Sequence, residues 1–242
     1  MQLDILAFGA HPDDVELFAG GTLAKMAACG YATGIVDMTR GELGTRGTAA
    51  RRAREAKEAA QVLGVRIREN LRLPDGEVNV DSKSRLKVIR VLRKYRPLLI
   101  LTHYWDDRHP DHISTSRLVA DAAHHSGLAK IDTGQERYRP KAVLYFKLPP
   151  QVLPDFVVDV SEVAEQRVRA IQAYRSQLFD ASNREPATNL SHPDFLTHIE
   201  NVSSYYGSLI GKTRGEGFVT RGIIEIPDLV AFFKTQSSIR FR

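Results

Sequence analysis

The sequence predicts an α/β fold that is Rossmann-like, with a mostly parallel twisted sheet and helices on both faces. Short apolar runs alternate with helical patterns, in the order βαβαβαβ as far as Thr102. The run Leu98–Thr102 is apolar almost throughout, as expected of a parallel strand buried on both faces. We therefore expect a single domain over residues 1–242, with the α/β core in 1–148 and a small C-terminal extension in 149–242 that completes it.

The core elements follow from apolar periodicity and from the residues that stop helices. Gly30 and Gly64 are suited to left-handed C-caps, and Pro97 cannot continue a helix. The predicted strands are Leu3–Phe8, Ala32–Met38, Val65–Leu73, Leu98–Thr102 and Lys141–Leu148. The predicted helices are Val15–Cys29, Ala49–Leu63, Ser82–Tyr95 and Ile113–His125. Cys29, near the end of the first helix, is interpreted as a core residue.

The C-terminal extension gives weaker patterns. Phe156–Asp159 is predicted to be a short strand, and Ser161 is predicted to cap a helix that runs to about Tyr174. A second helix is expected over Phe195–Ile210. We interpret 181–193 as a polar surface loop, and 211–217 is rich in glycine and charge.

Composition limits the class of protein. The chain is 43% hydrophobic, which is enough for a core, and no apolar run approaches the length of a membrane span. We expect no signal peptide and, with a single cysteine, a reducing cytoplasmic location without disulfides. The net charge of +5 permits an anionic partner, but the basic residues are spread along the chain. We therefore expect a solvated surface, with neither nucleic acid nor a membrane as partner.

The turn after the first strand carries one imidazole and two carboxylates within four residues. His11 and Asp14 could bind one cation, with Pro12 stiffening the link between them. Asp13 would then be free to act as a base beside that metal. The alternative is that Asp13 or Asp14 is simply an N-cap, because negative charge is favoured at the start of a helix.

A second polar cluster, residues 103–112, follows the buried strand Leu98–Thr102. Ligands of open α/β sheets collect outside the carboxyl ends of the strands, so we expect the two turns to meet there. Three protein ligands and an open position are typical of catalytic zinc, and His11, Asp14 and one of His109 or His112 would supply them. The spare histidine would donate to an oxyanion, and Asp111 could fix its tautomer.

Arginines gather after the second strand. Arg40 and Arg46 lie in a glycine-rich loop, and Arg51 and Arg52 lie in the first turn of the next helix. Positive charge at a helix N-terminus opposes the helix dipole, a cost more easily explained if one arginine faces an anion. The alternative is a solvated helix face with pairs such as Arg54 and Glu58.

The two histidine motifs together resemble a known family, the LmbE-like or PIG-L N-acetylglucosaminyl deacetylases. The residues that carry the resemblance are Ala10-His11-Pro12-Asp13-Asp14-Val15-Glu16 and His109-Pro110-Asp111-His112. The stretches most similar to the bacillithiol-pathway branch, which removes acetate from N-acetylglucosaminyl-malate, are Leu3–Glu16, Asp106–His112, Tyr174-Arg175-Ser176-Gln177 and Gly215-Glu216-Gly217-Phe218.

The resemblance implies a Rossmann-like fold and a role for each motif residue. His11, Asp14 and His112 would be the ligands of one zinc ion per chain, although another divalent metal is an alternative in the cell. Asp13 would be the base. His109 would stabilise the oxyanion or act as an acid, supported by Asp111. Arg52 would contact the substrate, and the chain would form a homo-oligomer, a hexamer or a tetramer.

The implied function is zinc-dependent hydrolysis of the N-acetyl group of a GlcNAc conjugate, most simply N-acetylglucosaminyl-malate in bacillithiol biosynthesis. Phe195 stands where relatives are expected to have a substrate-side tyrosine, which puts the exact substrate in doubt. One alternative is a deacetylase or amidase of the same fold that acts on another GlcNAc or thiol conjugate. An alternative of another class is a basic α/β module that binds nucleotide or nucleic acid without catalysis.

Overall fold

The computed structural model describes residues 1–235, and in that part of the chain one seven-stranded sheet has the order β3-β2-β1-β4-β5-β7-β6. The strands are β1 (Ile5–Gly9), β2 (Thr33–Asp37), β3 (Ile67–Asn70), β4 (Leu99–His103), β5 (Ala142–Phe146), β6 (Phe156–Asp159) and β7 (Gly215–Thr220). Strands β1 to β5 pair in parallel, and β7 is antiparallel to β5 and to β6. The predicted α/β class with a mostly parallel sheet is confirmed.

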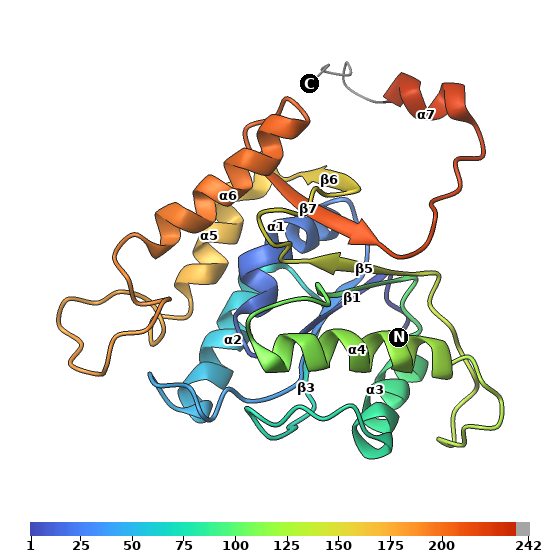
Figure 1. Ribbon diagram of the computed structural model, residues 1–242, viewed down its shortest axis with the longest axis horizontal. Coiled ribbons are helices and arrows are strands. Elements are labelled where there is room, and N and C mark those ends of the chain that lie inside the picture. The colour runs from blue at the N-terminus through green and yellow to red at the C-terminus, as the bar shows by residue number, and fades with distance from the viewer. Residues whose placement is uncertain (236–242) are drawn as a thin grey trace.

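Helices cover both faces of the sheet (Figure 1). They are α1 (Asp14–Ala28), α2 (Ala49–Leu63), α3 (Ser82–Tyr95), α4 (Pro110–His125), α5 (Ala164–Gln172), α6 (Phe195–Leu209) and α7 (Leu229–Thr235). Helices α3 and α4 pack on one face, and α1, α2 and α5 pack on the other. Residues 236–242 of the predicted C-terminal part lie outside the described residues.

Two apolar cores follow from the alternation of side chains along the strands. In β1, Leu6 and Phe8 join the core beneath α3 and α4, whereas Ile5 and Ala7 join the core beneath α1 and α2. All five residues of this strand are buried, because the sheet is covered on both sides. The central strand is therefore fixed on both faces, and so is the turn that leaves its carboxyl end.

Strand β7 was not predicted from the sequence, where 211–217 stands out only as rich in glycine and charge. Both glycines at its start are needed for close packing of α6. A Cβ atom on Gly215 would lie 2.7 Å from the backbone nitrogen of Gly207, and one on Gly217 would lie 2.8 Å from the ring of Tyr206. In the sequence these glycines suggest a turn, but in the structure they allow α6 to lie close against β7.

Two further local predictions were wrong. Ser161 does not cap a helix: its N–H and its hydroxyl both donate to the carboxylate of Asp159, and a short 3₁₀ turn over Ser161–Val163 precedes α5. Cys29 is exposed rather than buried, because it lies just beyond the last turn of α1.

The middle of α1 is held by a buried ion pair from the C-terminal part. Glu216 of β7 accepts hydrogen bonds from the N–H groups of Gly21 (2.8 Å) and Thr22 (2.7 Å). Arg167 of α5 lies 3.2 Å from Glu216 and donates to the carbonyl of Leu17. Gly21 is required at this contact, since a Cβ atom there would lie 2.9 Å from Glu216 Oε1. The C-terminal part thus fixes the helix that begins at the first polar turn.

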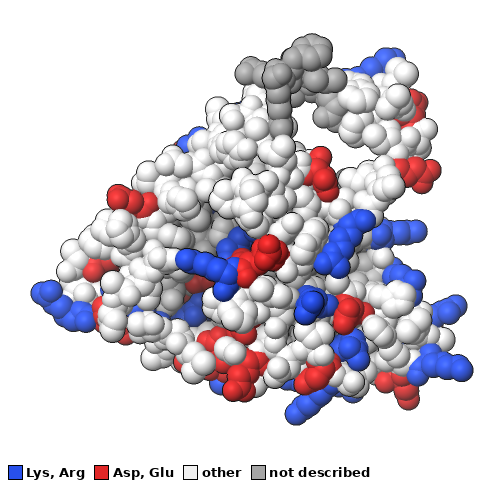
Figure 2. All heavy atoms as spheres, viewed as in Figure 1, with Lys and Arg blue, Asp and Glu red and all other residues white. Residues whose placement is uncertain are grey.

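The visible surface mixes both signs of charge, with lysine and arginine among aspartate and glutamate (Figure 2). After β7 an extended segment leads to α7, which stands apart from the body (Figure 1). Several large apolar side chains of this segment are exposed, namely Ile223, Ile224, Leu229 and Val230. Within residues 1–235, none of the helices has both the length and the apolar character needed to cross a bilayer.

The ion pair between Glu216 and Arg167 is expected to be essential for stability. Glu216→Ala leaves a buried guanidinium without its carboxylate and should lower the free energy of unfolding by about 3–5 kcal/mol. Glu216→Gln should cost less, because its amide oxygen can still accept a backbone hydrogen bond. Urea unfolding measures both. Glu162 is exposed, so Glu162→Gln serves as the control and should change the free energy of unfolding by less than about 0.5 kcal/mol. Equal effects of the substitutions at Glu216 and Glu162 would contradict the interpretation.

Candidate active site

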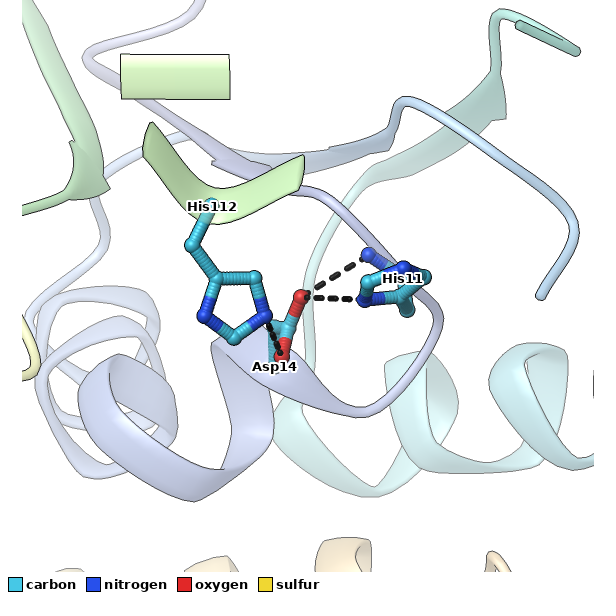
Figure 3. Close-up of side chains that lie close together, drawn as sticks. All are labelled: His11, Asp14 and His112. Carbon is cyan, nitrogen blue, oxygen red and sulfur yellow. Dashed lines mark hydrogen bonds and ion pairs between the residues drawn. The ribbon is translucent and has the colours of Figure 1, made fainter. Parts of the chain in front are cut away.

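Two polar turns meet at the carboxyl edge of the sheet. Strands β1 and β4 are neighbours, and each ends in a histidine-bearing turn that leads into a helix. Figure 3 shows His11 and Asp14 of the first turn facing His112, which lies in the first turn of α4. The turn after β1 and the turn after β4 therefore lie together in the structure, as predicted from the sequence.

His11, Asp14 and His112 lie close enough to hold one metal ion. Their candidate ligand atoms are all within 4.8 Å of one another. Asp14 Oδ2 lies 3.4 Å from His11 Nδ1, and Asp14 Oδ1 lies 3.3 Å from His112 Nε2. Neighbouring ligands of tetrahedral zinc are separated by roughly 3.4 Å, given bonds of about 2.1 Å. The two imidazoles and the carboxylate fit zinc in donor type and in spacing.

The charge of Asp14 also suits a cation. Burial alone would raise its pKa, but the neighbouring His112 holds the pKa of Asp14 well below its ordinary value. Its Oδ2 accepts a hydrogen bond from the N–H of His11 at 2.8 Å. A buried, ionised carboxylate fixed in this way is a preformed ligand.

His11 is surrounded by carboxylates from two other segments, the loop after β3 and the first turn of α4. Its Nε2 lies 3.0 Å from Asp75 Oδ1 and 3.4 Å from Asp111 Oδ2. Burial disfavours the charged form, but Asp111, Asp14 and Asp75 together raise the pKa of His11 well above its ordinary value. Carboxylates on the outer nitrogen of a ligand histidine orient the ring and make it a better ligand.

The carboxylate of Asp111 does not fix the tautomer of His109, contrary to the prediction from the sequence. This carboxylate accepts from the N–H groups of Gly76 (2.8 Å) and Val78 (3.2 Å) and faces His11. The contact with His109 comes instead from the backbone N–H of Asp111, which donates to His109 Nδ1 at 3.3 Å because His109 is the N-cap of α4. This bond leaves the hydrogen of a neutral imidazole on Nε2, where it can be donated.

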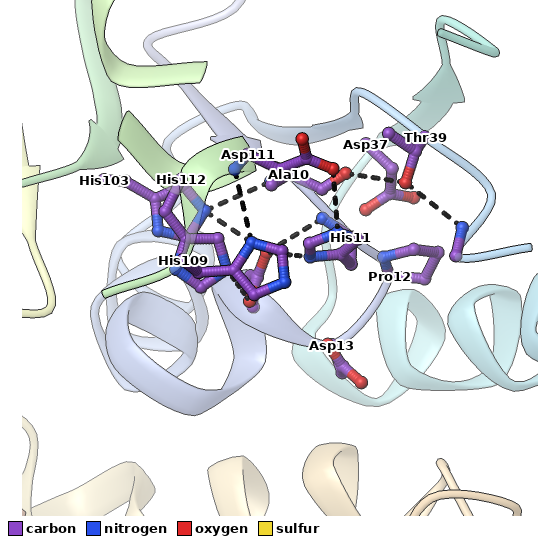
Figure 4. A network of polar contacts seen from close by, with 12 residues as sticks. Ala10, His11, Pro12, Asp13, Asp37, Thr39, His103, His109, Asp111 and His112 are labelled. Carbon is purple, nitrogen blue, oxygen red and sulfur yellow. Dashed lines mark hydrogen bonds and ion pairs between the residues drawn. The ribbon is translucent and has the colours of Figure 1, made fainter. Parts of the chain in front are cut away.

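Asp13 is held in an unusual backbone conformation by Arg52. Its φ of 115° is rare for a residue other than glycine, and strain of this kind concentrates at functional sites. The guanidinium of Arg52 donates to Asp13 Oδ2 at 2.9 Å and to the carbonyls of Pro12 and Gly41. Burial raises the pKa of Asp13 to about 7, although Arg52 opposes the shift. Figure 4 shows Asp13 on the turn beside the histidine cluster.

The anion that Arg52 faces is thus a residue of the protein itself. Arg52 is 5% exposed, and the structure directs its guanidinium towards Asp13 and two backbone carbonyls. This pairing accounts for positive charge in the first turn of α2, the feature from which substrate contact was inferred. The arrangement favours an indirect role for Arg52, in which it holds Asp13.

A cavity of about 820 Å³ lies beside this cluster. Its wall includes Asp107 and Lys147, which contact His112, and also Leu17, Phe18 and Phe195. Phe195, the residue that departs from the expected tyrosine, therefore contributes an apolar surface at the start of α6. The cavity has room for a sugar conjugate, and its wall includes Asp106, Asp107 and Arg108 of the second polar cluster.

Four residues of the site had no role assigned from the sequence. Asp75 lies in a Pro-Asp-Gly turn that signalled only a loop, and Lys147 follows β5 with no motif around it. Asp107 Oδ2 lies 3.1 Å from His112 Nδ1. His103 Nε2 accepts from the N–H of Ala10 at 3.1 Å, and burial lowers its pKa to about 3, so it links the two turns as a neutral ring.

The chain is similar to one protein family and to named deacetylases of other organisms. Residues 6–123 match the family model described as "PIG-L: GlcNAc-PI de-N-acetylase". Diacetylchitobiose deacetylase of Thermococcus kodakarensis is 28% identical over 88% of this chain and 81% of its own length. A probable N-acetyl-α-D-glucosaminyl L-malate deacetylase of Bacillus cereus is 29% identical over 73% of this chain and 84% of its own.

A solved structure extends the likeness to the whole fold. The conserved protein TT1542 of Thermus thermophilus superposes with a TM-score of 0.84 at 36% identity, covering 93% of this chain and 98% of that one. The matched family region contains both histidine turns, β1 to β4 and most of α4. The chain belongs to the PIG-L family, the family of GlcNAc-PI de-N-acetylase.

Proposed function

We propose that this chain is a metal-dependent N-deacetylase that hydrolyses the acetamide of a GlcNAc conjugate and releases acetate. One observation carries the proposal. His11, Asp14 and His112, here called the triad, lie together as candidate metal ligands, and Asp13, whose backbone is strained, lies on the same turn as His11 and Asp14. Relatives named as deacetylases of diacetylchitobiose and of N-acetylglucosaminyl-malate support the reaction class. A binding module would need neither the triad nor the strain at Asp13.

Each residue of the site has a definite task in this reaction. A divalent ion such as zinc, held by His11, Asp14 and His112, would supply a Lewis acid for the water and for the acetamide carbonyl. Asp13 accepts the proton of the attacking water, and Arg52 fixes the carboxylate that does so. His109 donates from Nε2 to the oxygen that becomes negative during attack, since its Nδ1 is occupied by the N–H of Asp111.

The aglycone is the finer part of the proposal. We propose a carboxylate-bearing aglycone, malate in the first instance, because Arg108 lies on the cavity wall, whereas Arg52 is paired with Asp13 and Lys147 with Asp107. The names of the two relatives given above indicate one neutral and one acidic substrate, diacetylchitobiose and N-acetylglucosaminyl-malate. The choice between them therefore depends on the cations of the cavity.

The first prediction concerns metal content. Wild-type protein should bind one divalent ion of the zinc class per chain, and Asp14→Ala and His112→Ala should each lose it, because each removes one of three ligands. Elemental analysis after dialysis measures the stoichiometry. His198→Ala, on the cavity wall but outside the triad, should retain the metal; full occupancy in the two triad variants would refute the ligand assignment.

The second prediction separates the base from the ligands. Asp13→Asn should keep the metal and lose activity by roughly 100- to 10,000-fold, because an amide cannot accept the proton of the water. Arg52→Ala should also keep the metal and lower kcat on every substrate, since it acts through Asp13. If Asp13→Asn released the metal, Asp13 would be a ligand instead.

A third prediction concerns His109. His109→Ala should retain metal and substrate affinity and lower kcat by roughly 100- to 1,000-fold, because an oxyanion donor acts on the transition state. Steady-state kinetics together with metal analysis separate these effects. Wild-type turnover in this variant would show that the second cluster contributes only His112.

The last prediction of this section concerns the aglycone. Acetate release from GlcNAc-malate should be far more efficient, in kcat/KM, than release from diacetylchitobiose, and Arg108→Gln should reduce that preference by roughly tenfold. Arg52→Ala should slow both substrates equally. Equal efficiency on the acidic and the neutral conjugate would exclude the malate proposal and leave the deacetylase proposal intact. Hydrolysis of thiol conjugates alone would favour the amidase alternative.

A further inference from the structure

The motif Tyr174-Arg175-Ser176-Gln177 follows α5 and has no task in the proposed reaction. None of its four residues lies on the wall of the cavity of about 820 Å³. The side chains of the motif are buried, except that of Arg175, which is exposed. Buried polar side chains are almost always hydrogen-bonded, so the partners of this motif show which segments it holds in place.

Ser176 binds a buried carboxylate of α2 twice. Its N–H donates to Glu55 Oε1 at 2.9 Å, and its hydroxyl donates to Glu55 Oε2 at 2.6 Å. Glu55 lies three residues after Arg52, so the two side chains leave the same face of the helix. Hydrogen bonds to an ionised carboxylate are among the stronger ones. Ser176 therefore fixes the rotation of α2 about its axis, and with it the direction of Arg52.

Gln177 holds the loop between β2 and α2. Its Nε2 donates to the carbonyl of Arg46 at 2.8 Å, and Arg46 Nη1 donates in return to the carbonyl of Leu178 at 3.0 Å. The next residue of the loop passes so close to the motif that a Cβ atom on Gly47 would lie 2.7 Å from Ser176 Oγ. The end of this loop is therefore fixed against the motif on both sides of one peptide bond.

The loop and α2 meet again at the guanidinium of Arg52. Its Nη1 donates to the carbonyl of Gly41 at 3.3 Å, and a Cβ atom on Gly41 would lie only 2.0 Å from that nitrogen. Its Nη2 donates to Asp13 Oδ2 at 2.9 Å. Arg52 thus reaches Asp13 with α2 behind it and the loop beside it, and the motif binds both of these segments.

The first residue of the motif reaches the helix that follows Asp13. The hydroxyl of Tyr174 donates to Glu16 Oε1 at 3.0 Å, and Glu16 is a fully buried residue in the first turn of α1. The motif therefore contacts all three segments that surround Asp13, namely α1, α2 and the loop before α2.

We propose that Ser176 and Gln177 are positioning residues for the reaction, which hold Arg52 where it keeps Asp13 in its strained conformation. They act from outside the cavity, so they should affect kcat rather than KM. The inference rests on the proposed function of Asp13 as the base, and it goes beyond that function by assigning a role to a motif remote from the two histidine turns.

The test compares Ser176→Ala and Gln177→Ala with the wild type in the full chain. Each should lower kcat for acetate release by about 10- to 100-fold, because a small misplacement of a catalytic group has a cost of this size. Both should keep their metal and a KM within about twofold of the wild type. Arg175→Ala is the matched control, since Arg175 belongs to the same motif but pairs with Glu58 on the surface. Its kcat should stay within about twofold.

A double-mutant cycle with Arg52→Ala separates positioning from a purely structural role. If Ser176 acts through Arg52, Ser176→Ala should lower kcat by less than about threefold once the guanidinium is absent. Gln177→Ala is carried through the same cycle, so the test does not depend on one variant, and urea unfolding verifies that each protein is folded at the assay temperature. Equal losses in both backgrounds would overturn the inference, as would wild-type kcat in both motif variants or a rise in KM alone.

NMR of the Arg52 guanidinium gives a readout that needs no substrate. While its Nη–H groups are bonded to Asp13 and Gly41, rotation is hindered and their signals are separate. Separate signals are expected in the wild type and in Arg175→Ala, and averaged signals in Ser176→Ala and Gln177→Ala. Averaged signals in the wild type, or separate ones in both motif variants, would overturn the inference. A wild type with the expected spectrum that releases no acetate from any GlcNAc conjugate would instead refute the proposed function, so the two failures are distinguishable.

Discussion

The candidate site depends on one buried ion pair, between Asp13 and Arg52. The turn after β1 must place two neighbouring carboxylates in different directions, and it does so through a φ of 115° at Asp13. Such a conformation costs on the order of 1–3 kcal/mol, and a carboxylate with so little access to water costs more unless it is paired. Arg52 offsets both, because it binds the Asp13 carboxylate and the carbonyl of Pro12 at once. Helix α2, which carries Arg52, is thereby attached to the polar turn of β1.

The sequence was sufficient to predict which segments meet, because parallel strands expose their carboxyl ends at one edge. His11, Asp14 and His112 are brought together as that rule requires. The sequence could not predict how the outer partners are distributed. Asp111 faces His11 rather than His109, because the backbone N–H groups of Gly76 and Val78 hold its carboxylate there. That arrangement depends on a loop some thirty-five residues earlier in the chain, and no pattern in the sequence around Asp111 predicts it.

The C-terminal part was harder to predict for a different physical reason. Its secondary structure is determined by packing against the core rather than by periodicity. Gly215 and Gly217 are strand residues because α6 lies too close for any side chain, and Glu216 between them is buried because α1 offers it two backbone N–H groups. A glutamate between two glycines would ordinarily indicate an exposed turn. Its partner Arg167 is 49 positions earlier in the chain, so the ion pair is visible only in three dimensions.

Helix α1 starts at the candidate metal ligand Asp14 and ends next to the exposed thiol of Cys29, the one cysteine of the sequence. At 1.5 Å per residue the helix holds these two positions roughly 22 Å apart. The chain therefore carries a natural attachment point for a single fluorescent or spin label at a known distance from the triad. A label there would report on a paramagnetic or coloured ion entering the site, with no engineered cysteine and no competing thiol.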